Sequence, residues 1–234
     1  MERLSEWSND LMRMIYPKVC EVCGYSLTKG EEIMCLHCSL DLPRANMHNE
    51  QFNIIHQRLA GHAPIDKAAG YFYYYKDNSY SNLILNAKYH NRPIIARLLA
   101  SRYAQEISNS GFFNDIDIIL PVPMHWIKRM RRGYNQSEAI AQGIKKVTGI
   151  EIGKNLIAKR GHSTQTRKSS YARWKNAQNI YTVTAPEQLE SKHVLVVDDV
   201  VTTGATLLAC CEAIHKVSPT TTISVLTLAV THLS

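Results

Sequence analysis

Hydrophobic and polar positions along this 234-residue chain form short apolar runs that alternate with segments of helical periodicity. Runs rich in β-branched and aromatic residues predict strands at 68–75, 116–120, 152–158, 180–184, 193–197 and 221–230. Helical periodicity predicts helices at 80–90, 93–107, 136–147 and 204–217. The run at 193–197 is apolar at nearly every position, as expected for a strand covered on both faces. The alternation predicts an α/β fold with a doubly wound, mostly parallel sheet.

Four of the six cysteines form two CxxC pairs that are separated by eleven residues. The pairs are Cys20 with Cys23 and Cys35 with Cys38. Each CxxC turn presents two thiolates to one point, and two such turns complete a tetrahedral site that suits zinc. Because four protein ligands leave no open position, the pattern predicts a structural zinc ion. The alternatives are unrelated buried cysteines, a redox-active CxxC pair, and His37 in place of one cysteine ligand.

These patterns divide the chain into three segments. We expect a four-cysteine zinc-binding module at 1–45, a linker or short helix at 46–66, and the main α/β domain at 67–234. Cys210 and Cys211 lie in an apolar helical run and are expected to be buried thiols without a function. Cysteines without a secretion signal favour a reducing, cytoplasmic setting. The sequence contains no run of about 18 apolar residues, which a transmembrane helix would need, so we expect no membrane insertion.

The net charge of +7 is concentrated in one segment. Residues 121–175 carry thirteen lysines and arginines against Glu138 and Glu151, a net charge of +11, whereas the rest of the chain carries −4. A positive excess indicates an anionic partner, and by itself it does not choose among nucleic acid, a phosphorylated metabolite and a membrane surface. A solvated basic face is the plain alternative.

The most specific stretch reads VLVVDDVVTTGATL, at 194–207. A buried strand leads into Asp198 and Asp199, and a short loop of small and hydroxyl residues then opens a helix. Ligands of open α/β sheets bind outside the carboxyl ends of the strands, and a helix N-terminus preceded by glycine offers N–H donors to a phosphate. Two carboxylates beside that phosphate suit vicinal hydroxyls or a magnesium ion. The stretch predicts a ribose 5-phosphate site, and ordinary capping of a helix is the alternative.

Residues 194–206 resemble the phosphoribosyl-pyrophosphate (PRPP) signature of type I phosphoribosyltransferases. The resemblance implies the sheet of that fold, magnesium bound with PRPP, and contacts from Asp198 and Asp199 to the ribose hydroxyls. It implies a 5-phosphate loop made of Thr202, Thr203, Gly204, Ala205 and Thr206. Purine-salvage members often carry an aspartate where this chain has Thr202, which argues against salvage of a purine base.

The resemblance extends to several other motifs. They are the paired CxxC start, Lys88-Tyr89-His90, PVPMH at 121–125, RRGYNQ at 131–136, and Thr164-Gln165 followed by Arg173 and Asn176. Together they span about residues 18–207 and resemble the ComF/GntX family. Members of this family are phosphoribosyltransferase-like proteins associated with DNA uptake and natural competence.

The resemblance also implies that two basic loops handle pyrophosphate. The turn after the strand at 116–120 corresponds to the pyrophosphate loop, with Val122 and Pro123 as candidates. The polar, basic stretch at 154–175 corresponds to a flexible loop that closes over the diphosphate and excludes water. Its candidate residues are Arg160, Arg167 and Arg173.

Thirteen cations exceed what a diphosphate requires, and aromatic residues are interleaved with them. Aromatic rings between cations suit base stacking over a basic groove, which predicts single-stranded DNA as a further partner. The candidates are Arg129, Arg131, Arg132, Tyr134 and Trp174.

Three functions fit these residues. The first is a PRPP-binding phosphoribosyltransferase whose acceptor and catalytic residues the sequence does not identify. The second is a non-catalytic DNA-uptake accessory protein that binds single-stranded DNA or the competence machinery and uses PRPP as a ligand or signal. The third is a zinc-dependent DNA-binding factor with a relict ribose site, which neither a helix-turn-helix pattern nor a two-Cys, two-His pattern supports.

Overall fold

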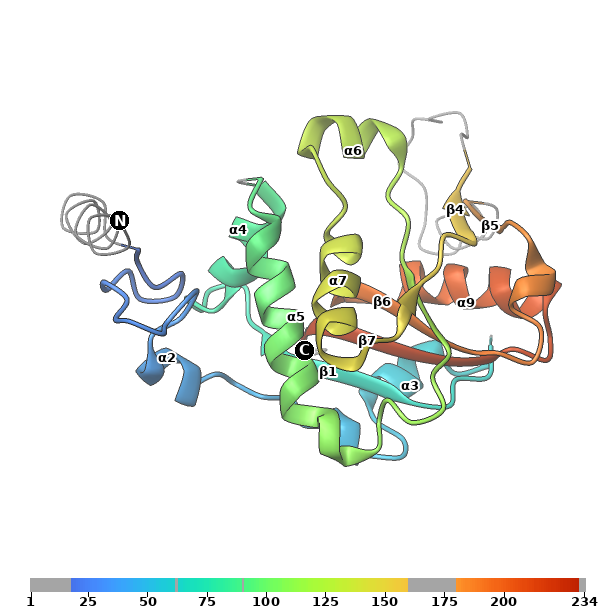
Figure 1. Cartoon of the computed structure of the whole chain (residues 1–234), viewed down its shortest axis with the longest axis horizontal. Helices are drawn as coiled ribbons and strands as arrows, with labels where there is room; N and C mark the ends of the chain where they lie inside the picture. Colours follow the sequence, from blue (N-terminus) through green and yellow to red (C-terminus); the bar gives the residue numbers. More distant parts are fainter. Residues whose placement is uncertain (1–17, 62, 90, 160–179, 232–234) are drawn as a thin grey trace, which may run out of the picture.

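A five-stranded parallel sheet forms the centre of the molecule (Figure 1). The computed structural model describes residues 18–61, 63–89, 91–159 and 180–231. The strands are β1 (Ala68–Tyr74), β2 (Ile118–Pro121), β3 (Glu151–Ile152), β6 (His193–Val201) and β7 (Thr222–Thr231). They lie in the order β1-β7-β6-β2-β3, and all neighbouring pairs are parallel. The predicted parallel sheet is confirmed.

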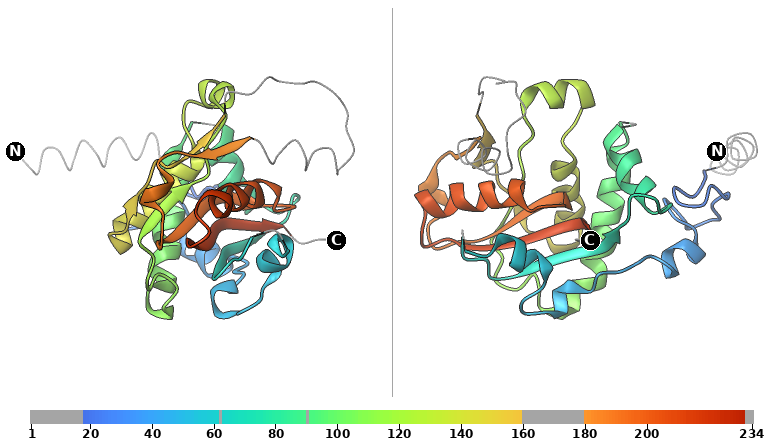
Figure 2. Two further views of the ribbon diagram at one scale, coloured as in Figure 1. Left: turned by 90° about the vertical axis from the view of Figure 1, so that its right-hand side faces the viewer. Right: turned by 180° about the vertical axis from the view of Figure 1, so that it is seen from behind.

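Helices cover both faces of this sheet (Figure 2). On one face lie α5 (Pro93–Ile107) and α7 (Gln136–Thr148), with α4 (Ser81–Tyr89) packed on α5, and on the other lie α9 (Ala205–Val217) and α3 (Ile54–Leu59). β6 contributes to both layers, because Leu195 and Val197 join one hydrophobic cluster and Val194 and Val196 join the other. Successive strand residues point to opposite faces, so a strand covered on both faces must be apolar throughout.

Two strands differ from the sequence prediction. β6 continues to Val201, which pairs with Val230, so Asp198 and Asp199 lie inside the paired strand and not after it. The stretch predicted as one strand at 152–158 forms β3 at the sheet edge and then β4 (Leu156–Ala158), which pairs antiparallel with β5 (Tyr181–Val183). Gly153 lies between β3 and β4, where a Cβ atom would come within 2.6 Å of the Ile118 side chain. The break between β3 and β4 therefore occurs at a glycine whose backbone packs directly against the Ile118 side chain.

A helix that the sequence pattern did not predict projects from the body of the protein. α6 (Trp126–Arg132) lies on an arm between β2 and α7, at the top of Figure 1, and none of its residues is buried. His125 Nδ1 accepts the N–H of Ile127 at 3.4 Å at its start, and Gly133, with φ of +84°, ends it. Because α6 has no buried face, hydrophobic periodicity gives no signal for it.

The cysteine module shares a hydrophobic core with the main domain. The module contains α2 (Leu36–Leu40), and Cys20, Met34 and Leu42 belong to the same buried cluster as the inner residues of α4 and α5. The segment that follows contains the turn η1 (Met47–Asn49) and α3, where Ile55 and Leu59 are fully buried. The stretch expected as a linker or short helix thus contributes to the core. The remaining short turns are η2 (Ser108–Ser110) and η3 (Pro186–Gln188).

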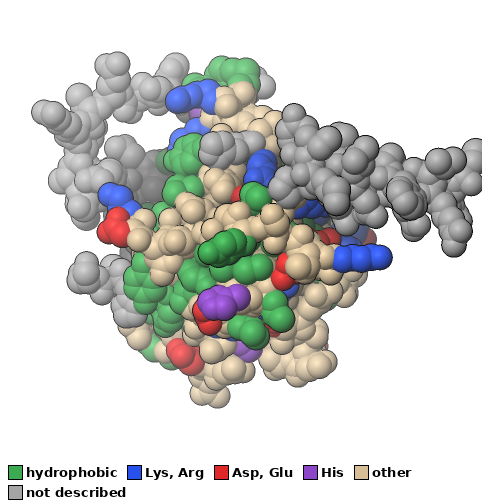
Figure 3. Space-filling model, turned by 90° about the vertical axis from the view of Figure 1, so that its left-hand side faces the viewer, with side chains coloured by type: hydrophobic (Ala, Val, Ile, Leu, Met, Phe, Trp, Pro, Cys, Tyr) green, Lys and Arg blue, Asp and Glu red, His purple; other side chains and the backbone are tan. Residues whose placement is uncertain are grey.

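The side of the molecule that carries the cysteine module exposes hydrophobic side chains among polar ones (Figure 3). Hydrophobic side chains gather near the middle of this face, and the module exposes Tyr25, Leu36 and Leu40. In the part of the chain that the structure describes, no helix has the length and apolar character needed to cross a bilayer.

Candidate functional site

Four cysteine thiols meet in the N-terminal module. The Sγ atoms of Cys20, Cys23, Cys35 and Cys38 all lie within 4.8 Å of one another, and those of Cys23 and Cys35 are 3.8 Å apart. Four thiolates at this spacing match the ligand set of a structural zinc site and leave no open coordination position. Among the described residues, no other group brings three or more metal-ligating side chains together. The predicted four-cysteine cluster is assembled, and its donor set fits zinc.

Backbone hydrogen bonds shape the two cysteine turns. Gly24 has a φ of +77°, which allows the tight turn after Cys23. Between the two cysteine pairs, the Glu31 carboxylate accepts two backbone N–H groups at 2.7 and 2.6 Å, and these bonds lower its pKa. Burial opposes ionisation of Cys20, yet backbone N–H groups outweigh it and lower the pKa of the thiol to about 7. Burial, and then hydrogen bonds to the other cysteine side chains, raise the pKa of Cys38, so within the cluster the thiolate that binds a metal is favoured at Cys20 and not at Cys38.

Asp198 and Asp199 lie in the carboxyl half of β6. Asp198 Oδ1 accepts the Ser137 hydroxyl at 3.0 Å and the Asp199 N–H at 2.9 Å. Burial, and then the neighbouring Asp199 carboxylate, raise the pKa of Asp198 to about 7. Carboxylates perturbed by both burial and a like charge are common at functional sites. Ser137, in the first turn of α7, was not singled out from the sequence because a lone serine carries no motif.

Lys88 reaches the acidic pair from the last turn of α4. Its Nζ lies 3.1 Å from Asp199 Oδ1, and the two side chains are only 22% and 16% exposed. The two carboxylates therefore differ in their surroundings. Asp199 has a cation partner, whereas the pKa of Asp198 is raised to about 7. Sequence reasoning placed Lys88 in a motif and gave it no role, since nothing local in the sequence identifies so distant a partner.

The loop at 202–206 follows β6 and opens α9. Gly204 has a φ of +80° and directly precedes Ala205, the first residue of this 13-residue helix. The other four residues of the loop are exposed, and a hollow of about 30 Å³ lies between the loop and Asp198. A helix N-terminus in this position offers backbone N–H donors to an anion. We call this end of the sheet the carboxyl edge, made of Lys88, Asp198, Asp199 and the loop at 202–206.

Arg58 supports the base of this loop from α3. Its guanidinium donates to the carbonyl oxygen of Val201 at 3.2 Å and to that of Thr231 at 2.5 Å, which ties the end of β6 to the end of β7. A Cβ atom on Gly204 would lie 3.2 Å from the Arg58 Cβ, so α3 also packs under the turn. Sequence reasoning did not identify this supporting role.

The loop after β2 begins next to the acidic pair, because Pro121 pairs with Val197. The Val122 N–H donates to Val197 O at 3.0 Å, and the Val122 carbonyl accepts the Asn135 side-chain amide at 2.9 Å. Pro123 has no N–H to donate. The two residues named from the sequence therefore lie at the base of the loop, and a diphosphate bound there would need other donors.

The arm holds the DNA candidates that the structure describes. Arg129 pairs with Glu138 through two bonds of 2.7 and 3.1 Å, and Arg132 donates to Gln136 at 2.7 Å. Arg131 is exposed. The other basic-loop candidates lie outside the described residues: Arg160, Arg167, Arg173 and Trp174.

Two contacts attach the arm to the end of α4. The hydroxyl of the half-buried Tyr134 donates to the Ala87 carbonyl, and the Arg132 guanidinium lies 5.6 Å from the ring centroid of Tyr89. The structure thus gives Tyr134 an anchoring contact, while Trp126 and Met130 on α6 are exposed.

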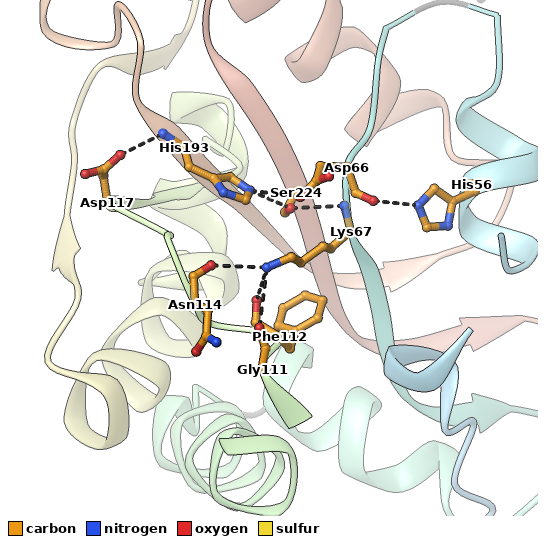
Figure 4. A network of polar contacts seen from close by, with 9 residues as sticks. All are labelled: His56, Asp66, Lys67, Gly111, Phe112, Asn114, Asp117, His193 and Ser224. Atoms are coloured by element: carbon orange, nitrogen blue, oxygen red, sulfur yellow. Dashed lines mark hydrogen bonds and ion pairs between the residues drawn. The ribbon is translucent and has the colours of Figure 1, made fainter. Parts of the chain in front are cut away.

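A larger cavity, of about 410 Å³, lies at the opposite end of the sheet, where the strands begin. In its polar network, Lys67 Nζ donates to three carbonyls of the turn at 111–114 at 3.1 to 3.4 Å (Figure 4). His193 Nε2 pairs with Ser224 Oγ at 2.8 Å, and the His193 N–H donates to Asp117 at 2.8 Å. Burial lowers the pKa of His193. We call this end the amino edge, made of the cavity, Lys67, Asp117, His193 and Ser224.

Comparisons with known proteins agree with this geometry. Residues 87–232 match the family model described as the phosphoribosyl transferase domain. Over 141 residues the chain is 28% identical to Competence protein F of Haemophilus influenzae, which covers 58% of this chain and 62% of that protein. Over 201 residues it is 27% identical to DNA utilization protein YhgH of Escherichia coli K12, which covers 81% of this chain and 80% of that protein.

A solved structure is similar to part of this chain at low identity. Glutamine PRPP amidotransferase from B. subtilis is 21% identical, with a TM-score of 0.40, over 56% of this chain and 25% of that chain. The family match covers more than half of the chain and includes both the acidic pair and the loop at 202–206. This chain carries an N-terminal four-cysteine cluster and is similar to competence protein F. By the family match, it belongs to the phosphoribosyl transferase domain family.

Proposed function

We propose that the carboxyl edge binds PRPP and that the chain transfers its phosphoribosyl group to an acceptor. The observation that carries this proposal is the adjacency of two carboxylates and a helix-opening loop at the carboxyl end of one buried strand. Vicinal ribose hydroxyls donate to Asp198 and Asp199, and the 5-phosphate accepts N–H groups of the loop at 202–206. A ribose 5-phosphate carries both groups.

In the proposed reaction, the bond between ribose C1 and a pyrophosphate oxygen breaks while the acceptor forms a bond to C1. Pyrophosphate leaves with the bonding electron pair. Asp198 and Asp199 hold the ribose through its hydroxyls, and the loop at 202–206 holds the 5-phosphate, so that C1 has a defined position. Lys88 orients Asp199 by its ion pair at 3.1 Å.

Magnesium is proposed to bind together with PRPP. Among the described residues, Asp198 and Asp199 are not joined by a third metal-ligating side chain, so most of the ligands would come from PRPP and water. Magnesium held there with PRPP would supply positive charge against the negative charge that develops on departing pyrophosphate. We assign further positive charge in this role to Arg160, Arg167 and Arg173, and a structural role to zinc on the four cysteines.

Thermal unfolding tests this proposal. PRPP with magnesium is expected to raise the melting temperature, because a ligand at about 100 times its Kd adds about 2.7 kcal/mol to stability. Asp199→Asn is expected to abolish the shift, whereas Glu190→Gln, an exposed change of the same charge, leaves it intact. No shift of the unmodified protein at millimolar PRPP and magnesium contradicts the proposal. Release of pyrophosphate with a panel of acceptors then separates an enzyme from a PRPP-binding accessory protein.

A second proposed ligand is single-stranded DNA, bound on the arm. It is favoured by the exposure of Trp126 and Met130 beside the exposed cations Lys128 and Arg131 on α6. The names of the relatives, which refer to competence and DNA utilization, support a role in DNA uptake and the uptake machinery as a partner.

DNA binding on the arm has a distinct signature. Affinity for an oligonucleotide should fall steeply with salt, and Lys128→Ala with Arg131→Ala should weaken it and flatten the salt slope. Binding that ignores both salt and these changes rejects the arm as the DNA site. PRPP binding should be unaffected by the same two changes.

A further inference from the structure

The cysteine module and the carboxyl edge meet at one corner of the chain. α4 ends at Tyr89 and α5 begins at Pro93. Between them, Asn91 has a φ of +48°, in the left-handed region. This corner sets the direction in which the last turn of α4 points, and Lys88 lies in that turn.

Glu21, between the ligands of the first CxxC pair, bonds to both sides of the corner. Its carboxylate accepts the Asn86 side-chain amide of α4 at 2.8 Å and pairs at 2.7 Å with Arg92, the residue before α5. The Glu21 side chain is only 5% exposed, and a carboxylate so buried is stable only while its partners are in place. We call these three residues the corner clamp: Glu21, Asn86 and Arg92.

The clamp is attached to the metal cluster through its own backbone. The Glu21 N–H donates to Ile33 O at 2.9 Å, in the loop that connects the two cysteine pairs. A metal ion that joins Cys20 and Cys23 to the second pair therefore fixes the position of Glu21 from both sides. Without the ion, the turn keeps this hydrogen bond and those from Cys20 N–H to Tyr25 O at 2.8 Å and from Gly24 N–H to Cys20 O at 2.9 Å, but it loses the connection through its cysteines to the second pair.

Lys88 is held between the clamp and the acidic pair. It lies two residues after Asn86 and four before Arg92, and its Nζ contacts Asp199 at 3.1 Å. A lysine side chain has several rotatable bonds, so it meets one carboxylate reproducibly only when its backbone is fixed. The clamp supplies that constraint on the side of α4 that faces the module.

We propose that the metal-loaded cysteine module positions Lys88 at the ribose carboxylates through the corner clamp. The consequence for PRPP rests on the proposed function, whereas the positioning itself does not. Glu21 is a positioning residue in this scheme, since it contacts neither the metal nor the ligand. Loss of the metal then lowers PRPP affinity without any change at the carboxyl edge itself.

Glu21→Gln tests the clamp, with Glu32→Gln as a matched control of the same charge change on an exposed residue of the module. Three quantities are measured on the full chain: zinc per chain, the rate at which an amine-reactive reagent labels Lys88, and the Kd for PRPP with magnesium. For Glu21→Gln we expect about one zinc per chain, labelling of Lys88 several-fold faster, and a Kd about tenfold higher. Glu32→Gln should match the unmodified protein, and labelling of Lys67 should stay unchanged in both.

Arg92→Met keeps the inference testable if Glu21→Gln does not fold, because it breaks the clamp outside the cysteine turns. Removal of zinc by a zinc-selective chelator, with magnesium in excess, should raise Lys88 labelling in the same way. Unchanged Lys88 labelling in the zinc-loaded variants overturns the inference, whatever PRPP does. If labelling responds but the unmodified protein does not bind PRPP, the proposed function fails and the positioning stands.

Discussion

The two ends of the central sheet differ in what their polar groups are bonded to. At the amino edge the cavity is large, about 410 Å³, and Lys67 is bonded to three carbonyls and His193 to Ser224. Of the polar groups in its lining, the buried Nδ1 of His48 has no hydrogen-bond partner among the described residues. At the carboxyl edge the hollow is only about 30 Å³, yet it is bordered by Asp198, whose pKa is raised to about 7, and by the exposed loop at 202–206. The large cavity and the carboxyl group with a raised pKa thus lie at opposite ends of the sheet.

This difference shows which observation locates a site. Polar groups that bond to one another stabilise the fold, and they have little left to offer a ligand. Buried groups that are held at a cost in stability are retained where a ligand compensates for that cost. Because of the raised pKa of Asp198 and the exposed loop at 202–206, we propose the carboxyl edge as the functional end. We propose that the bonded Lys67 and His193 at the amino edge close the strand starts.

The strongest test of the comparison is ligand affinity at each edge. Asp199→Asn is expected to raise the Kd for PRPP with magnesium about 100-fold, because a charge-assisted hydrogen bond to a hydroxyl is worth about 1.5–3 kcal/mol. Lys67→Met at the amino edge is expected to change this Kd by less than twofold. Isothermal titration calorimetry of both variants provides the measurement. A large loss of affinity in Lys67→Met would reverse the assignment of the two edges.

Stability should respond in the opposite order. Lys67→Met removes the ammonium group that donates hydrogen bonds to three carbonyls of the turn at 111–114. We expect this loss to lower the free energy of unfolding by about 2 kcal/mol. In a chain of this size that corresponds to a drop of about 4–8 °C in melting temperature. Asp199→Asn should lower it less. Equilibrium urea unfolding of both variants checks the order, and a more stable Lys67→Met protein would refute the closing role of the amino edge.

Asp198→Asn is expected to stabilise the protein while it removes PRPP binding. Folding raises the pKa of Asp198 to about 7, so the folded state binds this proton more tightly than the unfolded state. Its contribution to stability is therefore lost as pH rises from about 4 to about 7. Asparagine keeps an oxygen to accept Ser137 and the Asp199 N–H. We expect a melting temperature a few degrees above that of the unmodified protein at pH 8, with no gain at pH 4.5.

The smallest effect concerns His193, whose titration has the opposite sign. Burial lowers its pKa below the usual value, so the unfolded state binds the proton more tightly and stability falls as pH drops through about 6.5. His193→Gln retains a nitrogen for Ser224 and removes this titration. Melting curves between pH 7.5 and 5 should fall less steeply for His193→Gln than for the unmodified protein. An identical pH profile would show that His193 does not contribute to the acid sensitivity.

Much of the fold was predictable from the sequence, for identifiable reasons. The apolar run at 193–197 and the alternation of strands and helices follow from burial on both faces of a sheet, and the structure contains both. The two CxxC pairs are a local pattern typical of a four-thiol site, so the four-cysteine cluster could be predicted as well. α6 could not be predicted, since a helix without a buried face leaves no periodic signal.

The candidate site was predictable in its local parts and not in its long-range contacts. Asp198, Asp199 and the loop at 202–206 are contiguous, and their order carries the chemistry. Lys88 and Arg58 reach this edge from α4 and α3, where neither lies in a pattern that names its partner. Such contacts depend on how helices pack, which a single sequence does not encode in its spacing.

Hydrogen–deuterium exchange with and without PRPP and magnesium tests the central claim most directly, because it reports on both edges in one experiment. We predict slower exchange at 198–207 and in the last turn of α4 when PRPP is bound, and unchanged exchange at 66–68 and 110–114. Protection at 66–68 and 110–114 with none at 198–207 would contradict the account, because it would place the ligand at the amino edge.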